Sequence, residues 1–249
     1  MNIQLLVLIV ILAAVLYRFR SFFFYLRGLR AFKKNRKDRT AVLLTKAASM
    51  GMKPKHRLTT GYILLSQGSI EEADRILTPL RGVREKGFNH QEAGIYCSLL
   101  LWKKGMIDEA VSELEELLAG GYKTTTLYTN LGFYLQEKGD LDRALELNLE
   151  AREYNEDSKG ILDNLGAVRI LREEWDLAAP LYEKLMTMSP TFPEAFYHAA
   201  LVHRHRGEDE KALQQLKEGE QQTFTELSTV GREAFAALRA ELEDREISQ

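Results

Sequence analysis

A period of 34 residues is the feature of this sequence that most restricts its fold. Residues 125–158 contain two amphipathic helical patterns, with apolar residues three and four positions apart, joined by a short turn at Lys138–Asp140. The tripeptide Asn-Leu-Gly at 130–132 returns at 164–166, which is 34 residues later. A fixed period of this length, with a helix–turn–helix in each unit, predicts an array of stacked helical hairpins.

The repeated residues follow a known pattern. A turn of the form Gly-x2-(Asp/Glu)-x-Ala recurs at 68–73, 105–110, 139–144 and 207–212, while one unit has Glu173 in place of the glycine. The chain therefore resembles the tetratricopeptide repeat (TPR) family over residues 54–226, in units at about 54–87, 91–124, 125–158, 159–192 and 193–226. The resemblance implies an all-α, right-handed superhelical solenoid of about five units. Within the unit at 125–158, we expect the two helices to cross at the small residues Gly132 and Ala144.

The ends of the array need separate elements. Residues 227–249 form one more amphipathic pattern, apolar on one side and charged on the other, which predicts a capping helix and tail. Residues 81–90 are mostly polar and predict a loop between the first two units.

The first residues of the chain predict a membrane anchor. Residues 3–17 are apolar apart from Gln4, and the aromatic-rich residues 22–26 extend the helix to about 36 Å, enough to cross a hydrocarbon core of about 30 Å. A cleaved signal peptide would need a basic residue before the apolar run, and a core helix would need a partner outside the array. Residues 1–26 are therefore interpreted as an uncleaved transmembrane helix.

A basic segment follows the anchor and sets its orientation. Residues 18–39 contain nine Lys or Arg and one acidic residue, whereas the rest of the chain is acidic. Positive residues stay on the cytoplasmic side of a span, so we expect the N-terminus outside and the array in the cytoplasm. Lipid head groups are a better partner than nucleic acid, which the acidic remainder would repel. The expected lipid contacts are Arg18, Arg20, Arg27, Arg30, Lys33 and Lys34. Within the basic juxtamembrane segment at 27–53, residues 40–52 predict a short helix that covers the first repeat.

Motifs of enzymes and metal sites do not occur. The sequence has no glycine-rich phosphate loop, no HExxH, no GxSxG and no paired CxxC. The single cysteine, Cys97, excludes a disulfide framework and a multi-cysteine zinc site. We therefore expect no enzyme activity, no cofactor and no metal.

The resemblance points to binding in a groove. In the TPR family, the first helix of each unit lines a concave face. The positions of this helix that face inward correspond in this chain to Tyr96, Asn130, Asn164 and His198 (position 6 of their units), Phe133 (position 9) and Tyr197 (position 5). An asparagine amide can pair with the backbone of an extended peptide whatever its sequence. The alternative is that Asn130 and Asn164 satisfy nearby backbone groups, and that aromatic residues such as Trp102 pack between units.

These features together predict a membrane-anchored TPR scaffold or adaptor that holds a protein or peptide partner at the cytoplasmic face. A membrane-bound transport or assembly receptor, and a self-associating homo-oligomer, are the alternatives. The layout is similar to that of bacterial anchored repeat proteins of the lipopolysaccharide assembly protein B type. Those proteins carry a rubredoxin-like cysteine-rich end, which one cysteine cannot build.

Overall fold

The structure is a computed structural model that describes residues 3–247, and every regular element in that range is a helix. This confirms the predicted all-α fold. Its contacts divide the chain into two compact units, Met1–Leu100 and Leu101–Gln249, which are described separately. The elements in chain order are α1 (Ile3–Lys33), α2 (Lys37–Ser49), α3 (Pro54–Ser66), α4 (Ile70–Leu77), the 3₁₀ helix η1 (Thr78–Gly82), α5 (His90–Lys103), α6 (Ile107–Ala119), α7 (Thr125–Glu137), α8 (Leu141–Tyr154), α9 (Lys159–Leu171), α10 (Trp175–Thr187), α11 (Pro193–His205), α12 (Asp209–Gly219) and α13 (Arg232–Ile247).

One turn geometry recurs in six hairpins of the described chain. Each first helix ends before a residue of positive φ, and the next N–H donates to the carbonyl five residues earlier, as Asp140 N does to Leu135 O at 3.0 Å. This is a Schellman cap, which pairs carbonyls that the helix end leaves open. The turn residues are Asn35, Gly68, Gly105, Gly139, Glu173 and Gly207. The residue five positions after each of them is small and fully buried; these are Thr40, Ala73, Ala110, Ala144, Ala178 and Ala212.

Glycines allow the two helices of a hairpin to approach closely. A Cβ on Gly166 would lie 2.6 Å from Cε2 of Tyr182, and one on Gly132 would lie 2.6 Å from Oδ1 of Asn148. The crossing partner of Gly132 is therefore Asn148, one helical turn beyond the expected Ala144. Ala144 is itself buried at the start of α8.

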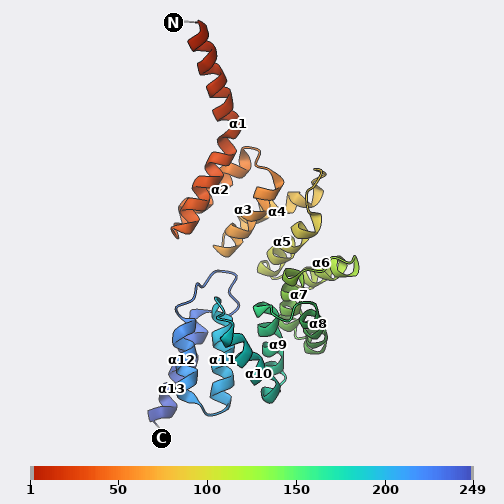
Figure 1. The fold of residues 1–249 in the computed structure, drawn as a ribbon, viewed down its shortest axis with the longest axis vertical. Coiled ribbons are helices and arrows are strands. Elements are labelled where there is room, and N and C mark those ends of the chain that lie inside the picture. The colour runs from red at the N-terminus through yellow and green to blue at the C-terminus, as the bar shows by residue number, and fades with distance from the viewer. Residues whose placement is uncertain (1–2, 248–249) are drawn as a thin grey trace. The chain divides into compact units, whose positions relative to one another are not determined.

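The first unit begins with a hairpin that the repeat pattern did not predict. From Ser21 onward α1 packs against α2: the Ser21 hydroxyl donates to the carbonyl of Ala47 at 2.8 Å, and Gly28 lies against Leu44. The α1–α2 turn at Asn35 has the same Schellman bond as the later hairpins (Figure 1). The predicted boundary at residue 26 thus falls inside a continuous helix, and the predicted covering helix is the second helix of a repeat-like hairpin.

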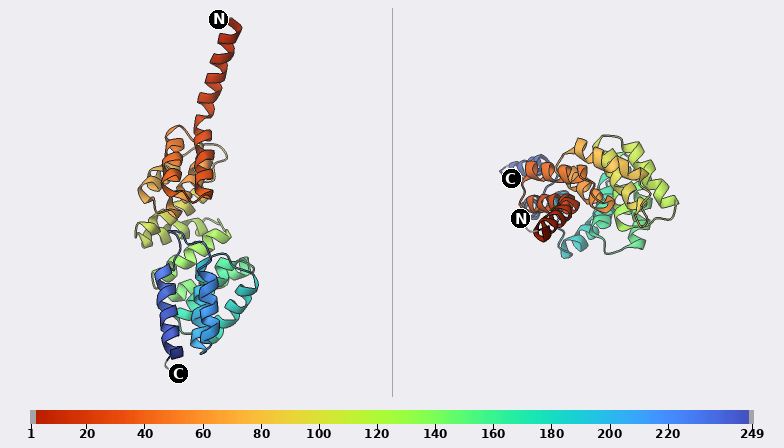
Figure 2. Two further views of the ribbon diagram at one scale, coloured as in Figure 1. Left: turned by 90° about the vertical axis from the view of Figure 1, so that its left-hand side faces the viewer. Right: turned by 90° about the horizontal axis from the view of Figure 1, so that it is seen from above.

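The N-terminal half of α1 is exposed along its whole length. Residues 3–19 are all exposed, and this part of the helix stands away from the rest of the first unit (Figure 2). Among the described residues, α1 is the one helix long and apolar enough to cross a membrane.

The second unit contains the hairpins α7–α8, α9–α10 and α11–α12, with α6 before them and α13 after them. The apolar face of α13 packs on α11 and α12, where Phe235, Leu238 and Leu242 meet Ala200 and Leu216. The predicted terminal helix is therefore present, but it begins at Arg232. The preceding residues 220–231 form an irregular connection, which we call the closing loop.

Candidate functional site

The candidate site lies on the side of the second unit that is lined by the first helix of each hairpin. Helices α7, α9 and α11 follow one another as neighbours. The closing loop extends from α12 toward the C-terminal end of α5 before it returns to α13 (Figure 1). We call the surface formed by the end of α5 with α7, α9 and α11 the first-helix face.

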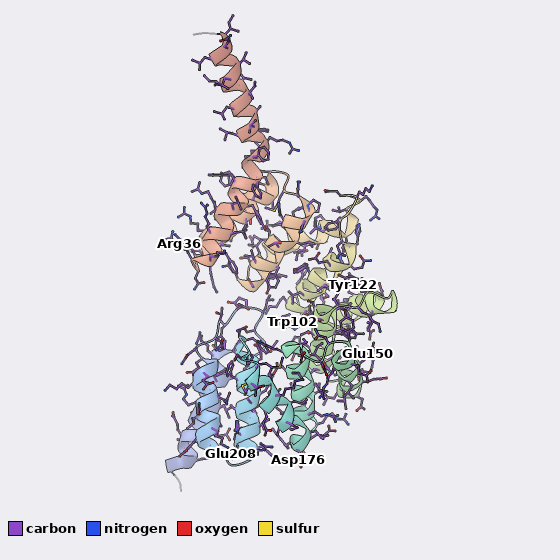
Figure 3. The ribbon with its side chains drawn as sticks, viewed as in Figure 1. Arg36, Trp102, Tyr122, Glu150, Asp176 and Glu208 are labelled. Atoms are coloured by element: carbon purple, nitrogen blue, oxygen red, sulfur yellow. The ribbon has the colours of Figure 1, made fainter. Side chains whose placement is uncertain are left out.

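An aromatic cluster forms one end of this face. The Trp102 ring meets Phe133 edge-on at 5.2 Å and stacks on Tyr134 at 6.2 Å between ring centroids. The ammonium group of Lys103 lies 4.8 Å from the Trp102 ring centroid and donates to the carbonyl of Glu226 in the closing loop at 2.6 Å (Figure 3). The predicted residue Phe133 is therefore half-buried between the first helices of neighbouring repeats. Lys103 adds a cation that was not predicted from the sequence.

The two predicted asparagines differ in their surroundings. Asn164 is 8% exposed, and its amide donates to the carbonyl of Thr129 at 2.7 Å, which joins α9 to α7. Asn130 is partly exposed, and its side chain makes no hydrogen bond within residues 3–247. The amide of Asn164 thus joins two helices of the array, whereas the amide of Asn130 faces partly into solvent.

A buried polar cluster forms the other end of the face. Asp163 of α9 lies 2.9 Å from Nδ1 of His198 on α11, and it accepts a hydrogen bond from the Tyr182 hydroxyl at 3.3 Å. Burial alone would lower the pKa of His198, but the charge and hydrogen bond of Asp163, aided by Glu194, raise it above its ordinary value. Burial and the same carboxylate raise the pKa of Tyr182 well above 10.0. Asp163 therefore favours the protonated form of His198.

Glu194 connects the polar cluster to the closing loop. Its side chain accepts a hydrogen bond from the backbone N–H of Thr229 at 2.7 Å. Burial raises the pKa of Glu194, and the nearby charge of Asp163 adds to this, whereas backbone hydrogen bonds oppose it. Glu194 and Lys103 were not predicted as site residues, although both occupy inward positions of their repeats. The prediction considered amide and aromatic side chains for the groove and did not include charged ones.

The two remaining predicted residues lie in different units. Tyr96 belongs to the first unit, where it meets Tyr62 edge-on at 5.8 Å, and burial raises the pKa of its hydroxyl. Tyr197 belongs to the second unit and packs on Phe235 at 5.4 Å between ring centroids.

The expected lipid-contacting residues are spread along α1. The Arg20 guanidinium covers the Tyr17 ring at 3.7 Å, and Arg27 lies 5.4 Å from the Phe23 ring centroid. Lys33 and Lys34 are exposed beside the α1–α2 turn. The turn residue Arg36 lies at the end of the hairpin away from residues 3–19 (Figure 3).

The described residues contain no group of three or more His, Cys, Asp or Glu that could hold a metal ion. Cys97 is buried with its thiol 3.9 Å from the carbonyl of Leu77.

Comparison with solved structures shows the fold. The chain is similar to a tetratricopeptide repeat protein from Parabacteroides merdae, with 14% identity over 90% of this chain and 85% of that chain and a TM-score of 0.74. It is also similar to TTC0263, a thermophilic TPR protein of Thermus thermophilus, with 18% identity over 78% of this chain and 100% of that chain and a TM-score of 0.61.

A third match is to a chain of the Cut9–Hcn1 hetero-tetramer of APC/C, with 15% identity, a TM-score of 0.67 and coverage of 89% of this chain and 42% of that chain. No protein-family model matches the sequence, and no curated protein matches it. At these identities the likeness establishes the TPR fold alone, because a shared fold does not fix a shared function.

Proposed function

We propose that this chain is a single-pass membrane-anchored TPR scaffold whose first-helix face binds an extended segment of a protein partner at the cytoplasmic side. The observation that carries the proposal is the closing loop, because side chains of the first-helix face hold this loop by its backbone. The ammonium group of Lys103 donates a hydrogen bond to the carbonyl of Glu226, and the carboxylate of Glu194 accepts one from the N–H of Thr229.

Backbone groups are present in every peptide, so this mode of binding requires little of the partner's sequence. Each hydrogen bond to a charged group contributes about 1.5–3 kcal/mol, and 1.4 kcal/mol corresponds to a tenfold change in affinity. The ring of Trp102 lies beside Lys103, and Tyr197 follows Glu194 by three residues on α11, so both rings offer apolar contact area for side chains. A partner segment would therefore bind between a cationic and an anionic anchor.

The exposed half of α1 supports the anchoring part of the proposal. Seventeen exposed helical residues, 3–19, span about 25 Å, and the outward rings of Phe22 and Phe23 extend the apolar surface. An anchored array raises the local concentration of its ligand at the bilayer without any additional contact.

A peptide with the sequence of residues 221–231 tests the binding face. The full chain would be prepared in detergent with residues 225–229 replaced by Gly and Ser, which empties the face, and a labelled peptide would be added while its fluorescence anisotropy is recorded. We expect saturable binding, weakened at least tenfold by Glu194→Gln combined with Lys103→Met. A scrambled peptide and a surface variant, Glu183→Gln, are the matched controls.

Absence of binding, or binding that the double variant leaves unchanged, would show that the loop packs there for structural reasons alone. Helicity measured by circular dichroism would exclude misfolding of the variants.

The anchor is tested on native membranes. The full chain should remain in the pellet after alkaline carbonate extraction, and protease should cleave the exposed turn at 33–39 only in inside-out vesicles. Release by carbonate, or cleavage in right-side-out vesicles, would contradict the anchor or its orientation.

A further inference from the structure

We propose that a basic rim formed by Arg18, Arg20, Lys53 and Lys55 binds the anionic phospholipid head groups that surround the anchor. The inference rests on the proposed membrane insertion of α1. It makes the rim the lipid-contacting surface, in place of most of the basic run 27–39. It follows from where the first hairpin begins and from how α3 returns to α1.

The hydrocarbon region must end before Ser21. The hydroxyl of Ser21 donates to Ala47 of α2, so α2 begins to cover α1 at this level. On α2, Lys46 is exposed with its ammonium 4.5 Å from the Phe24 ring centroid, and a charged group of this kind belongs in the head-group region or in water. The span is therefore residues 3–19, with the Phe22 and Phe23 rings at the interface.

The start of α3 lies at the same level. The ring of His56 stacks on Tyr25 with centroids 4.7 Å apart, and it lies 5.7 Å from Phe22. Lys53 and Lys55 both precede His56 within three residues, and both are exposed. Burial lowers the pKa of His56, and the charges of the two lysines lower it further, so they are close enough to act on this ring.

The distal basic residues are too far away to contribute much. Lys33 lies 13 residues beyond Arg20 on one continuous helix, which is about 20 Å along the axis. The Debye length at physiological ionic strength is about 8 Å, so the attraction of an exposed charge at that distance falls to roughly a tenth of its value at the surface. The turn residue Arg36 is at the same distal end (Figure 3).

The folded hairpin thus sorts the basic residues into two groups. Arg18 and Arg20 lie at the end of the span, and the α2–α3 connection adds Lys53 and Lys55 to them. The run at 33–39, which the linear sequence places next to the anchor, lies at the far end of the α1–α2 hairpin. Cations at this rim match anionic lipids such as phosphatidylglycerol, whose negative surface potential attracts juxtamembrane lysines.

The test measures lipid selectivity next to the rim. A Phe22→Trp reporter would be introduced into the full chain, which is then reconstituted in vesicles that contain phosphatidylcholine with either brominated phosphatidylcholine or brominated phosphatidylglycerol. Quenching of the added tryptophan reports the lipid beside residue 22, and the chain without the reporter supplies the background. We expect phosphatidylglycerol to be enriched at least fivefold over its bulk fraction.

Two double variants distinguish the rim from the distal run. Lys53→Gln with Lys55→Gln should lower the enrichment at least fivefold, because each cation near the surface contributes about 1 kcal/mol, or about a fivefold change in binding. The matched control, Lys33→Gln with Lys34→Gln, removes the same charge and should change the enrichment less than twofold. Equal losses in both variants, or a loss in the control alone, would overturn the proposal.

The outcomes also separate this inference from the anchor itself. Absence of quenching by both brominated lipids would mean that Phe22 is not at a bilayer, which refutes the anchor and the rim together. Quenching by both lipids without selectivity would refute the rim while the anchor stands. Circular dichroism of each reconstituted variant would confirm that the hairpin remains folded.

Discussion

Substitution of Asn148 by leucine should stabilise the second unit. Asn148 is fully buried on α8 opposite Gly132; its amide nitrogen donates to Ala144 O at 2.7 Å, while its Oδ1 has no hydrogen-bond partner. The equivalent residues of the other hairpins are buried and larger or more apolar; they are Leu44, Leu77, Leu114, Tyr182 and Leu216. The pair Gly61–Leu77 shows that this packing accepts a leucine opposite a glycine.

The expected gain follows from four contributions. Removal of a buried unpaired acceptor recovers about 1–3 kcal/mol, and burial of a leucine side chain contributes about 1.5–3 kcal/mol. Loss of the amide hydrogen bond to Ala144 costs about 1 kcal/mol, and imperfect packing of the larger side chain costs about 1–3 kcal/mol. From the middle of these ranges, the free energy of unfolding should rise by about 1 kcal/mol, which corresponds to an increase of about 2–4 °C in Tm for a domain of this size.

The assay is thermal unfolding of the full chain in detergent, followed by circular dichroism of the helices. Asn148→Asp is the matched control, because it keeps the shape and places a charge without a partner in the core, so it should melt several degrees below the wild type. A leucine variant that melts at or below the wild-type temperature would refute the conclusion that Oδ1 is unsatisfied at a site able to hold leucine.

Three further predictions concern His198, the first hairpin and a turn. The pKa of His198 is raised in the folded chain above 6.5, so its stabilising effect is complete below about pH 6.5 and is lost as the pH rises through the folded pKa. His198→Gln should therefore lower Tm more at about pH 5.5 than at about pH 9, and equal losses would contradict this. Gly28→Ala places a methyl group against Leu44, so overpacking of about 1–3 kcal/mol should outweigh the gain of about 1 kcal/mol in helix propensity. Trypsin should then cleave faster within residues 33–39, and an unchanged rate would argue against a packed α1–α2 hairpin. Glu173 has a φ of 59°, which costs a residue with a side chain about 1 kcal/mol, so Glu173→Gly should raise Tm; a lower Tm would show that its side chain compensates for the strain.

Much of the fold could be predicted from the sequence because the repeat is local. Each hairpin depends on a helical apolar pattern, a residue that tolerates a positive φ and a small residue five positions later, and all three are visible in about 20 residues. The first hairpin escaped detection because Asn35 and Thr40 replace the glycine and alanine of that pattern. Asparagine also tolerates the left-handed conformation, so the backbone folds in the same way without the sequence signature.

The site was less predictable, because the surroundings of its residues depend on contacts between neighbouring repeats. Asn130 and Asn164 occupy equivalent positions, yet Asn164 is buried and its amide donates to the Thr129 carbonyl, whereas Asn130 is partly exposed. Periodicity assigns both to the same face, but it does not show which carbonyl lies within reach of which amide.

Sequence alone therefore determined the class of the fold, the apolar N-terminal helix and the faces of the helices, since each of these follows from the order of neighbouring residues. Tertiary structure decided that α1 continues into a packed hairpin, that His56 lies against Phe22, and that Lys103 contacts the backbone of Glu226, 123 residues away. The physical reason is that these contacts depend on the angles accumulated over successive hairpins. A small change in the packing angle of each hairpin alters which distant segments come into contact. The total of these angles cannot be read from any local sequence pattern.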